Sequence, residues 1–292
     1  QDLKAFLQVV RRTTYRRMTG RLLSAQMGFL AGFGATDPML AARLVGQQAA
    51  RLGAPLWVLY IDLATMFPRM HRGMLAHAEM VHGLPAEVIE LVGMIYGSAT
   101  DDPVWCQYDS AAGLSRRFAC PVGALMGCPL SPDRAKLLLN SIVVAIAAYA
   151  KGVVVFGESL EERWHRVMQL LYCDDWCGVF ASEEELQKAW DCWVAWEVAS
   201  GSRIGIKGTA KTVVTGVTYD NGMPRAVSDP LLKKANGDRI PFITHSSTYK
   251  HVGGPTRADA RSGDALRKLQ RGFGAALRRI RAMRRPTRQQ LV

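Results

Sequence analysis

The sequence has no apolar run long enough to cross a bilayer. Its longest such stretch, residues 137–150, is interrupted by Asn140 and Ser141 and is closed by Lys151, whereas a membrane-spanning helix needs about 20 apolar residues. The chain begins with Gln1 and shows no apolar signal segment. We therefore expect no membrane span, and a fragment or incomplete gene product rather than a secreted chain.

The six cysteines form no Cys-x-x-Cys pair and no cysteine–histidine cluster at zinc spacing. This argues against a structural zinc site and predicts buried, reduced thiols in an intracellular protein, in the nucleus or the cytoplasm. Internal repeats and low-complexity segments are also absent. The 292 residues are 49% hydrophobic, which predicts an ordinary globular core in one large domain or two small ones.

Acidic residues are in the minority, and the net charge is +12. The basic excess is uneven, because residues 257–292 hold eleven Lys or Arg against only Asp259 and Asp264. The arginines lie around most of a helical circumference with a thin apolar stripe, a pattern that suits phosphate neutralisation. A basic amphipathic helix that binds a membrane surface or a protein partner is the alternative. The composition therefore favours a nucleic-acid partner.

Hydrophobic patterning predicts an α+β chain. Residues 54–62 are a continuous apolar run of strand length, typical of a sheet covered on both faces, and the run ends on Asp62. Residues 167–173 and 176–180 are predicted strands of a hairpin with Asp174 and Asp175 at its tip. Helices are predicted over 1–24, 38–51, 72–82, 85–97, from 128–133 to 149, and over 182–199. Asp37 is the predicted N-cap of the second of these, and Ser182 with Glu185 is a predicted capping box for the last. The remaining predicted elements are strand pieces before 122, a strand at 211–217, a polar insertion near 219–240 and a short hairpin in 243–254. This order predicts a ferredoxin-like split βαβ antiparallel sheet with helices on one face.

Three carboxylates would converge at one edge of that sheet if the strand ending at Asp62 lies beside the hairpin of Asp174 and Asp175. Such groups repel one another and raise one another's pKa unless a divalent cation lies among them. Oxygen ligands without His or Cys suit Mg²⁺ or Mn²⁺. The alternative is a turn without further role, which is how we interpret the adjacent pair Asp101 and Asp102 in a polar stretch before Pro103.

Five segments resemble, in order, the sequence boxes of reverse transcriptases. They are YIDLATMF (60–67), GALMGCPLSP (123–132), YCDD (172–175), GIKGTAKT (205–212) and YKHVGG (249–254). Upstream, AQMGF (25–29) is similar to a segment of the enzymes of non-LTR retrotransposons and group II introns. The resemblance covers about residues 20–255. It implies partial fingers over 1–55, a polymerase palm over 56–255 and the basic start of a helical thumb over 256–292.

The resemblance implies an RNA-directed DNA polymerase that adds deoxynucleotides to a DNA primer on an RNA template. Asp62 and Asp174 would bind two Mg²⁺ ions, or Mn²⁺ instead, with Asp175 nearby and the backbone carbonyl of Leu63 facing a metal. Phe67 matches the aromatic residue that excludes a ribose 2'-hydroxyl. A core position is the alternative for Phe67.

The other boxes imply contacts to substrate and primer. Met126, Gly127 and Pro129 would lie at the template and the incoming nucleotide, with Gly127 allowing close backbone approach. Lys211 would protonate the departing pyrophosphate, and a solvated lysine is its alternative role. The hairpin of His251, Val252, Gly253 and Gly254 would grip the primer end.

The sequence also departs from the family pattern. Met126 stands where the family has Gln, and a thioether cannot replace the hydrogen bonds of an amide. Thr65 and Pro68 replace the Lys and Asp that commonly flank the aromatic residue, and the basic fingers segment would precede Gln1. Two alternatives follow: a retroelement relic or domesticated palm that binds nucleic acid without synthesis, and an RNA-directed RNA polymerase, against which Phe67 argues.

Overall fold

The structure is a computed structural model that describes residues 2–15, 22, 25–28, 32, 34–97, 104–107, 109–111, 113–120, 122–124, 127–156, 165–206, 212–251 and 254–260. The predictions for Asp101 and Asp102, for Met126 and Lys211, and for Val252 and Gly253 lie outside these residues. The same holds for residues 16–21 of the first predicted helix and for 261–292 of the basic tail.

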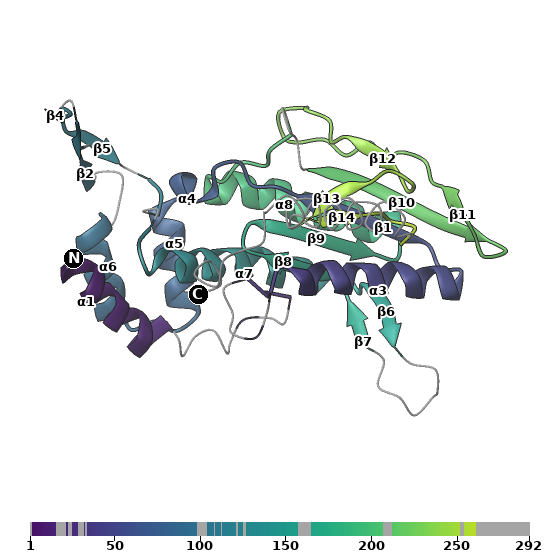
Figure 1. The fold of residues 1–292 in the computed structure, drawn as a ribbon, viewed down its shortest axis with the longest axis horizontal. Coiled ribbons are helices and arrows are strands. Elements are labelled where there is room, and N and C mark those ends of the chain that lie inside the picture. The colour runs from purple at the N-terminus through teal and green to yellow at the C-terminus, as the bar shows by residue number, and fades with distance from the viewer. Residues whose placement is uncertain are drawn as a thin grey trace, which may run out of the picture.

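A central sheet organises the chain (Figure 1). Its strand order is β11-β10-β1-β9-β8, with neighbours antiparallel, and a further strand, β12, pairs in parallel with β10. The strands are β1 (Leu56–Ile61), β8 (Gln169–Tyr172), β9 (Asp175–Phe180), β10 (Val213–Asp220), β11 (Met223–Ala226) and β12 (Phe242–Thr244). The first strand thus lies between two later ones, which agrees with the predicted split βαβ order.

Both faces of this sheet are covered. All six residues of β1 are buried, and alternate side chains enter two different clusters, because successive residues of a strand point to opposite faces. Trp57, Leu59 and Ile61 share one cluster with α7 (Ser131–Tyr149) and α8 (Glu183–Ser200). Leu56, Val58 and Tyr60 share the other with Val45 and Ala49 of α3 (Thr36–Leu52). The prediction of helices on one face was therefore wrong, since α3 covers the opposite face.

The remaining helices, among them the short α4 (Met66–Arg69), and two projecting arms of paired strands complete the described body. The helices α5 (Arg72–Val81) and α6 (Ala86–Tyr96) confirm the predictions for 72–82 and 85–97. They lie at the end of the molecule where α1 (Asp2–Val10) and its π-helical continuation Arg11–Tyr15 are found (Figure 1). One arm consists of β2 (Val104–Cys106), β3 (Asp109–Ser110), β4 (Gly113–Leu114) and β5 (Phe118–Cys120), and the other is the pair of β6 (Val153–Phe156) and β7 (His165–Val167).

Helix starts were predicted with mixed success. The Ser182 hydroxyl accepts a hydrogen bond from the Glu185 backbone N–H at 3.2 Å, so the predicted cap of α8 is confirmed. The Glu185 carboxylate, however, accepts from the Lys151 backbone N–H rather than closing a reciprocal box. Asp37 does not cap α3, which begins at Thr36; its carboxylate accepts from the Gly34 N–H instead.

The last predicted hairpin has different partners in the structure. β13 (Tyr249–His251) pairs with β14 (Gly254–Thr256), whereas β12 leaves that region and joins the edge of β10. The hairpin thus begins in the box at 249–254, whereas residues 242–244 belong to the central sheet.

The cysteines are all free, and only Cys177 is buried; the other five, Cys106, Cys120, Cys128, Cys173 and Cys192, are partly exposed. The prediction of buried thiols was thus wrong for five of the six. Among the helices of the described ranges, none has the length and apolar character that a bilayer crossing requires.

Candidate active site

The register of the sheet brings the predicted aspartates to one end. The pairing of β1 with β9 ends at Ile61 opposite Trp176, so one step further Asp62 lies opposite Asp175. On the other side of Asp175 its partner is Tyr172 of β8. Residues directly opposite in an antiparallel pair have Cα atoms about 4.5–5.5 Å apart. Because β8 ends at Tyr172 and β9 begins at Asp175, the turn of this hairpin consists of Cys173 and Asp174. Cys173 has a φ of 60°.

The charges that act on neighbouring groups support this placement. Burial raises the pKa of the Tyr249 hydroxyl, and repulsion by Asp175 and Asp62 raises it further. Burial likewise raises the pKa of the Cys173 thiol to about 11, with contributions from Asp174 and Asp175. Asp62 and Asp175 therefore both act on the Tyr249 hydroxyl, and Asp174 and Asp175 both act on the Cys173 thiol.

The donor set fits a cation that takes few protein ligands. In the part of the chain that the structure describes, no group of three or more His, Cys, Asp or Glu side chains is arranged to hold a metal ion. The predicted set of three carboxylates is thus not assembled there. Mg²⁺ is commonly held by one or two carboxylates and completes its shell with water and phosphate oxygens. Two aspartates from neighbouring segments fit that mode for Mg²⁺ or Mn²⁺.

The backbone of Asp62 is fixed by the segment 203–206 and by Thr212. The Gly205 N–H donates to the Asp62 carbonyl at 2.9 Å, and the Asp62 N–H donates to the Thr212 hydroxyl at 3.0 Å. A Cβ at Gly205 would lie 3.4 Å from the Asp62 carboxylate oxygen Oδ2. Leu63 is buried and forms a bridge with Ile204. The two described ends of the box at 205–212, Gly205 and Thr212, therefore both contact Asp62 of the box at 60–67.

The turn that carries Asp174 is held by the upstream segment 25–28. The Leu171 N–H donates to the Ala25 carbonyl and the Met27 N–H to the Leu171 carbonyl, each at 2.8 Å. A Cβ at Gly28 would lie 2.3 Å from the Cys173 backbone nitrogen. The resemblance of AQMGF to the family did not predict that this segment contacts the turn of Asp174. Gly28, which permits the close approach, is the sequence feature that could have indicated the contact.

The box at 123–132 packs against the box at 60–67. The Ala124 N–H donates to the Phe67 carbonyl at 2.8 Å, and a Cβ at Gly123 would lie 2.6 Å from the Pro68 carbonyl oxygen. Phe67 is partly buried against the core. Gly127 is exposed with φ of +81°, a conformation that favours glycine, and Pro129 is buried before α7.

The predicted primer hairpin stacks on β1. The rings of Tyr249 and Tyr60 are parallel within 21° at 4.2 Å, and the Tyr60 hydroxyl donates to Thr256 at 3.3 Å. His251 is 1% exposed, its ring lies 5.3 Å from that of Tyr60, and burial lowers its pKa to about 4. The His251 side chain therefore supports the hairpin from within, which corrects the prediction that it contacts a primer. Gly254 pairs with His251 at the hairpin end.

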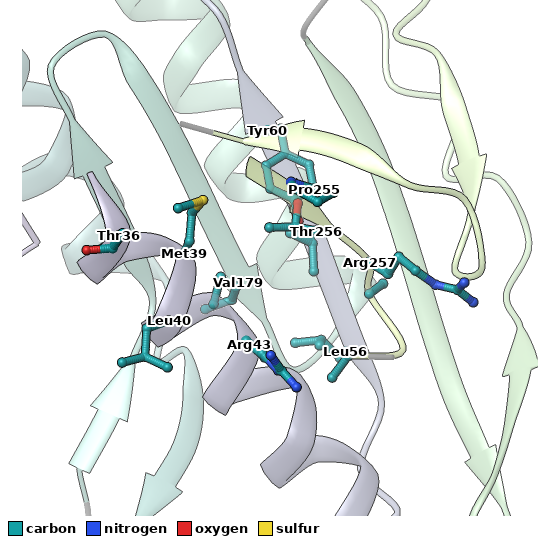
Figure 2. A pocket seen from close by; sticks show the side chains of 14 residues that line it. Thr36, Met39, Leu40, Arg43, Leu56, Tyr60, Val179, Pro255, Thr256 and Arg257 are labelled. Atoms are coloured by element: carbon teal, nitrogen blue, oxygen red, sulfur yellow. The ribbon is translucent and has the colours of Figure 1, made fainter. Parts of the chain in front are cut away.

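Behind Tyr60, on the α3 face of the sheet, there is a cavity of about 280 Å³ (Figure 2). Met39 and Leu40 of α3 lie on one side, Leu56 and Val179 of the sheet on another, and Pro255 and Thr256 of β14 close it. The β13–β14 hairpin, which packs on Tyr60, therefore borders this cavity and is only partly supported by packed atoms.

Among the solved structures that are partly similar to this fold are two telomerases from Candida species. The apo telomerase from Candida tropicalis matches with a TM-score of 0.45 and 12% identity, over 69% of this chain and 35% of that one. A telomerase from Candida albicans in complex with a fragment of telomeric RNA matches with a TM-score of 0.42 and 13% identity, over 82% and 38%. The chain thus spans little more than a third of these telomerase chains. Neither a protein-family model nor a curated protein matches the sequence.

Proposed function

We propose that this chain is an RNA-directed DNA polymerase domain, most like those of non-LTR retrotransposons and group II introns. Residues 56–255 would be its palm. The observation that carries the proposal is the register that places Asp62 opposite Asp175, directly beside the turn of Asp174. Ala124 of the box at 123–132 bonds to Phe67, and Gly205 and Thr212 of the box at 205–212 bond to Asp62 itself, which supports a shared site.

Asp62 and Asp174 would hold the ions, with Asp175 as a nearby charge. Two bound Mg²⁺ ions supply activation of an attacking hydroxyl and stabilisation of a leaving oxygen in phosphoryl transfer. The bonds from Gly205 and to Thr212 hold the Asp62 backbone in place. Phe67 would exclude the 2'-hydroxyl of a ribonucleotide, Lys211 would donate a proton to pyrophosphate, and the β13–β14 hairpin would support the primer.

Primer extension by the full-length protein tests the proposal, with an RNA template, a DNA primer, deoxynucleotides and Mg²⁺ or Mn²⁺. We expect extended product from the wild type and at least about a hundredfold less from Asp174→Asn, which keeps the shape and removes the charge. Asp191→Asn, at an exposed position of α8, is the matched control and should retain activity. Absence of product from the wild type, or full activity in Asp174→Asn, would contradict the proposal.

A palm that binds nucleic acid without synthesis is the second candidate. It is favoured by the absence of an assembled three-carboxylate group in the described ranges and by Met126 in place of Gln. It predicts tight, salt-dependent binding of RNA or duplex that is unchanged in Asp174→Asn, with no incorporation by either protein. Any Mg²⁺-dependent incorporation by the wild type excludes it.

A further inference from the structure

The arm of β2, β3, β4 and β5 projects from the molecule (Figure 1) and carries two of the six cysteines. Cys106 is the last residue of β2, and Cys120 is the last residue of β5. In the antiparallel pairing of these strands Val104 lies opposite Cys120, and Cys106 lies opposite Phe118. Residues two apart on a strand point to the same face, so the two cysteines are diagonal neighbours on one face of the arm. We call them the arm dithiol.

The two thiols of the arm dithiol are in contact. They share a hydrogen bond, and this bond, together with burial, raises the pKa of the Cys106 thiol, whereas the positive charge of Arg72 lowers it. Both cysteines are partly exposed, so a small reagent in the solvent reaches them. A structural zinc ion takes four ligands, but within the described ranges no third His, Cys, Asp or Glu side chain joins the pair in a group that could hold a metal. The arrangement therefore favours chemistry between the two sulfur atoms.

Arg72 of α5 places a positive charge beside the arm dithiol. Burial lowers the pKa of its guanidinium, and the neighbouring thiols of Cys120 and Cys106 raise it. Its Nε donates to the Gly123 carbonyl at 3.2 Å, which holds the guanidinium next to the end of β5. A neighbouring cation favours the thiolate form of cysteine, and the thiolate is the form that attacks oxidants and disulfides. Arg72 thus counteracts the burial and the hydrogen bond that keep the pair protonated.

We propose that the arm dithiol is a modification site, at which hydrogen peroxide forms a disulfide between Cys106 and Cys120 and a thiol such as glutathione reduces it again. In the first step one thiolate attacks a peroxide oxygen, the O–O bond breaks, hydroxide leaves and a sulfenic acid forms. The second thiolate attacks the sulfenic sulfur, and the hydroxyl group leaves with a proton as water. Two thiols and one hydrogen peroxide thus give one disulfide and two water molecules. Two glutathione molecules return the two electrons by thiol–disulfide exchange and leave as oxidised glutathione.

Formation of the disulfide moves the strands of the arm. Diagonal residues of a strand pair are about 7–8 Å apart, whereas the Cα atoms of a disulfide are usually about 5.5–6 Å apart, so β2 must shift along β5. A disulfide that closes only after such a shift is more easily reduced, as a reversible site requires. The segment after β5 is bonded to the box at 60–67, because the Gly123 N–H donates to the Met70 carbonyl at 2.9 Å and the Ala124 N–H to the Phe67 carbonyl at 2.8 Å. Oxidation therefore acts on a segment that contacts this box, whichever reaction the box performs.

Thiol counting and peptide mapping after oxidation test the proposal. The reduced protein is treated with one equivalent of hydrogen peroxide, and its free thiols are counted before and after addition of glutathione. We expect the loss of two of the six thiols and their full return. Trypsin cuts after Arg116 and Arg117, so the arm dithiol is divided between peptides 73–116 and 118–134. In the oxidised protein a disulfide should join these two peptides, with a yield that is independent of protein concentration because the bond forms within one chain.

Two variants complete the experiment. Cys120→Ser should lose both the joined peptides and the reversible loss of two thiols. Cys192→Ser, which removes a partly exposed cysteine of α8, is the matched control and should form the disulfide like the wild type. Circular dichroism verifies that each variant is folded, and if Cys120→Ser unfolds, the peptide map of the wild type decides by itself. Peptides joined through Cys128 instead of Cys120, a thiol loss that glutathione does not reverse, or no thiol loss at one equivalent of peroxide would overturn the proposal.

Discussion

The strand register places Asp62 opposite Asp175, beside the turn of Asp174, and the proposed ion site has an energetic consequence there. Like charges at such a site repel when no cation is bound, and a bound cation reverses the effect. Asp62→Asn should therefore raise the melting temperature of the metal-free protein and remove the further increase that Mg²⁺ or Mn²⁺ gives the wild type. Thermal unfolding with and without the ions measures both changes. Equal responses to the ions in both proteins would contradict a metal site at Asp62, and Asp191→Asn should respond like the wild type.

Phe67 is the residue that we propose selects the sugar of the incoming nucleotide. Its carbonyl is fixed by the Ala124 N–H and its ring is partly buried, so its position is set by two boxes at once. Phe67→Ala should raise ribonucleotide incorporation relative to deoxynucleotides by about tenfold or more. Competing extension reactions with the two nucleotide classes measure this ratio, with the exposed-arm variant Trp105→Ala as a control. Ribonucleotide preference in the wild type would instead favour an RNA polymerase.

His251 should make the fold acid-sensitive. Burial lowers its pKa from 6.5 to about 4, so between these values the unfolded chain binds a proton that the folded chain excludes. Stability is therefore complete above pH 6.5 and falls as the pH decreases towards 4, by about 3 kcal/mol at most. His251→Phe, which keeps an aromatic ring beside Tyr60, should show a smaller loss. Denaturant unfolding across this pH range compares the two proteins, and parallel curves would contradict the assignment.

At the scale of elements, the contact between segment 25–28 and the β8–β9 turn admits no side chain on Gly28. A Cβ would lie 2.3 Å from the Cys173 nitrogen, so either the segment or the turn must move. Gly28→Ala should cost about 1–3 kcal/mol of stability and should lower incorporation, because the turn carries Asp174. Gly34→Ala is the matched control, since its Cβ would meet nothing closer than 3.7 Å. Unfolding curves and primer extension measure both effects, and a silent Gly28→Ala would show that the turn tolerates displacement.

The elements that the sequence predicted well are those with local signals. β1 is a six-residue apolar run, and α8 begins at a serine whose hydroxyl binds the N–H three residues later. The position of α3 on the opposite face of the sheet was not predictable from its own pattern, because that choice depends on which strand it meets. The partner of β12 was missed for the same reason: Phe242 pairs with Val214, 28 positions before it in the chain.

The same contrast applies to the candidate site. Asp62, Asp174 and Asp175 could be named because each directly adjoins an apolar strand, and Gly205 and Gly28 could be matched to boxes. That His251 lies buried against Tyr60 could not be predicted, since histidine carries no pattern that separates an inner position from an outer one. The ion pair of Arg134 and Glu79 also had no sequence signal, because its partners are on different helices.

At the scale of the whole molecule, the net charge of +12 predicts that nucleic-acid affinity depends strongly on salt. Each phosphate that the protein neutralises releases counterions, so the logarithm of the affinity should fall linearly with the logarithm of the salt concentration. A chain that ends at residue 260 lacks most of the basic tail and should bind more weakly with a shallower slope. Fluorescence anisotropy with a labelled RNA–DNA duplex measures both quantities. An unchanged slope would place the phosphate contacts elsewhere.

The N-terminal segment is joined to the rest of the molecule by charged groups as well as by apolar packing. Arg11 donates to Asp133 at 2.5 Å, and Asp133 also pairs with Lys136 at 2.6 Å. Tyr15 reaches Glu79 of α5. Removing one member of such a partly buried group leaves another charge unpaired, so the segment is an integral part of the fold.

The backbone pairing of residues 25–27 with Leu171 of β8 should also hinder association of the protein with itself. Without these residues β8 would be the last strand of the sheet, and its apolar sequence QLLY would present unpaired N–H and C=O groups to any other strand. Exposed strand edges of this kind are sites of aggregation. Segment 25–28, which supports the turn of Asp174, thus also covers part of the edge of β8. A change that displaces this segment should therefore both loosen the turn and expose the edge to other strands.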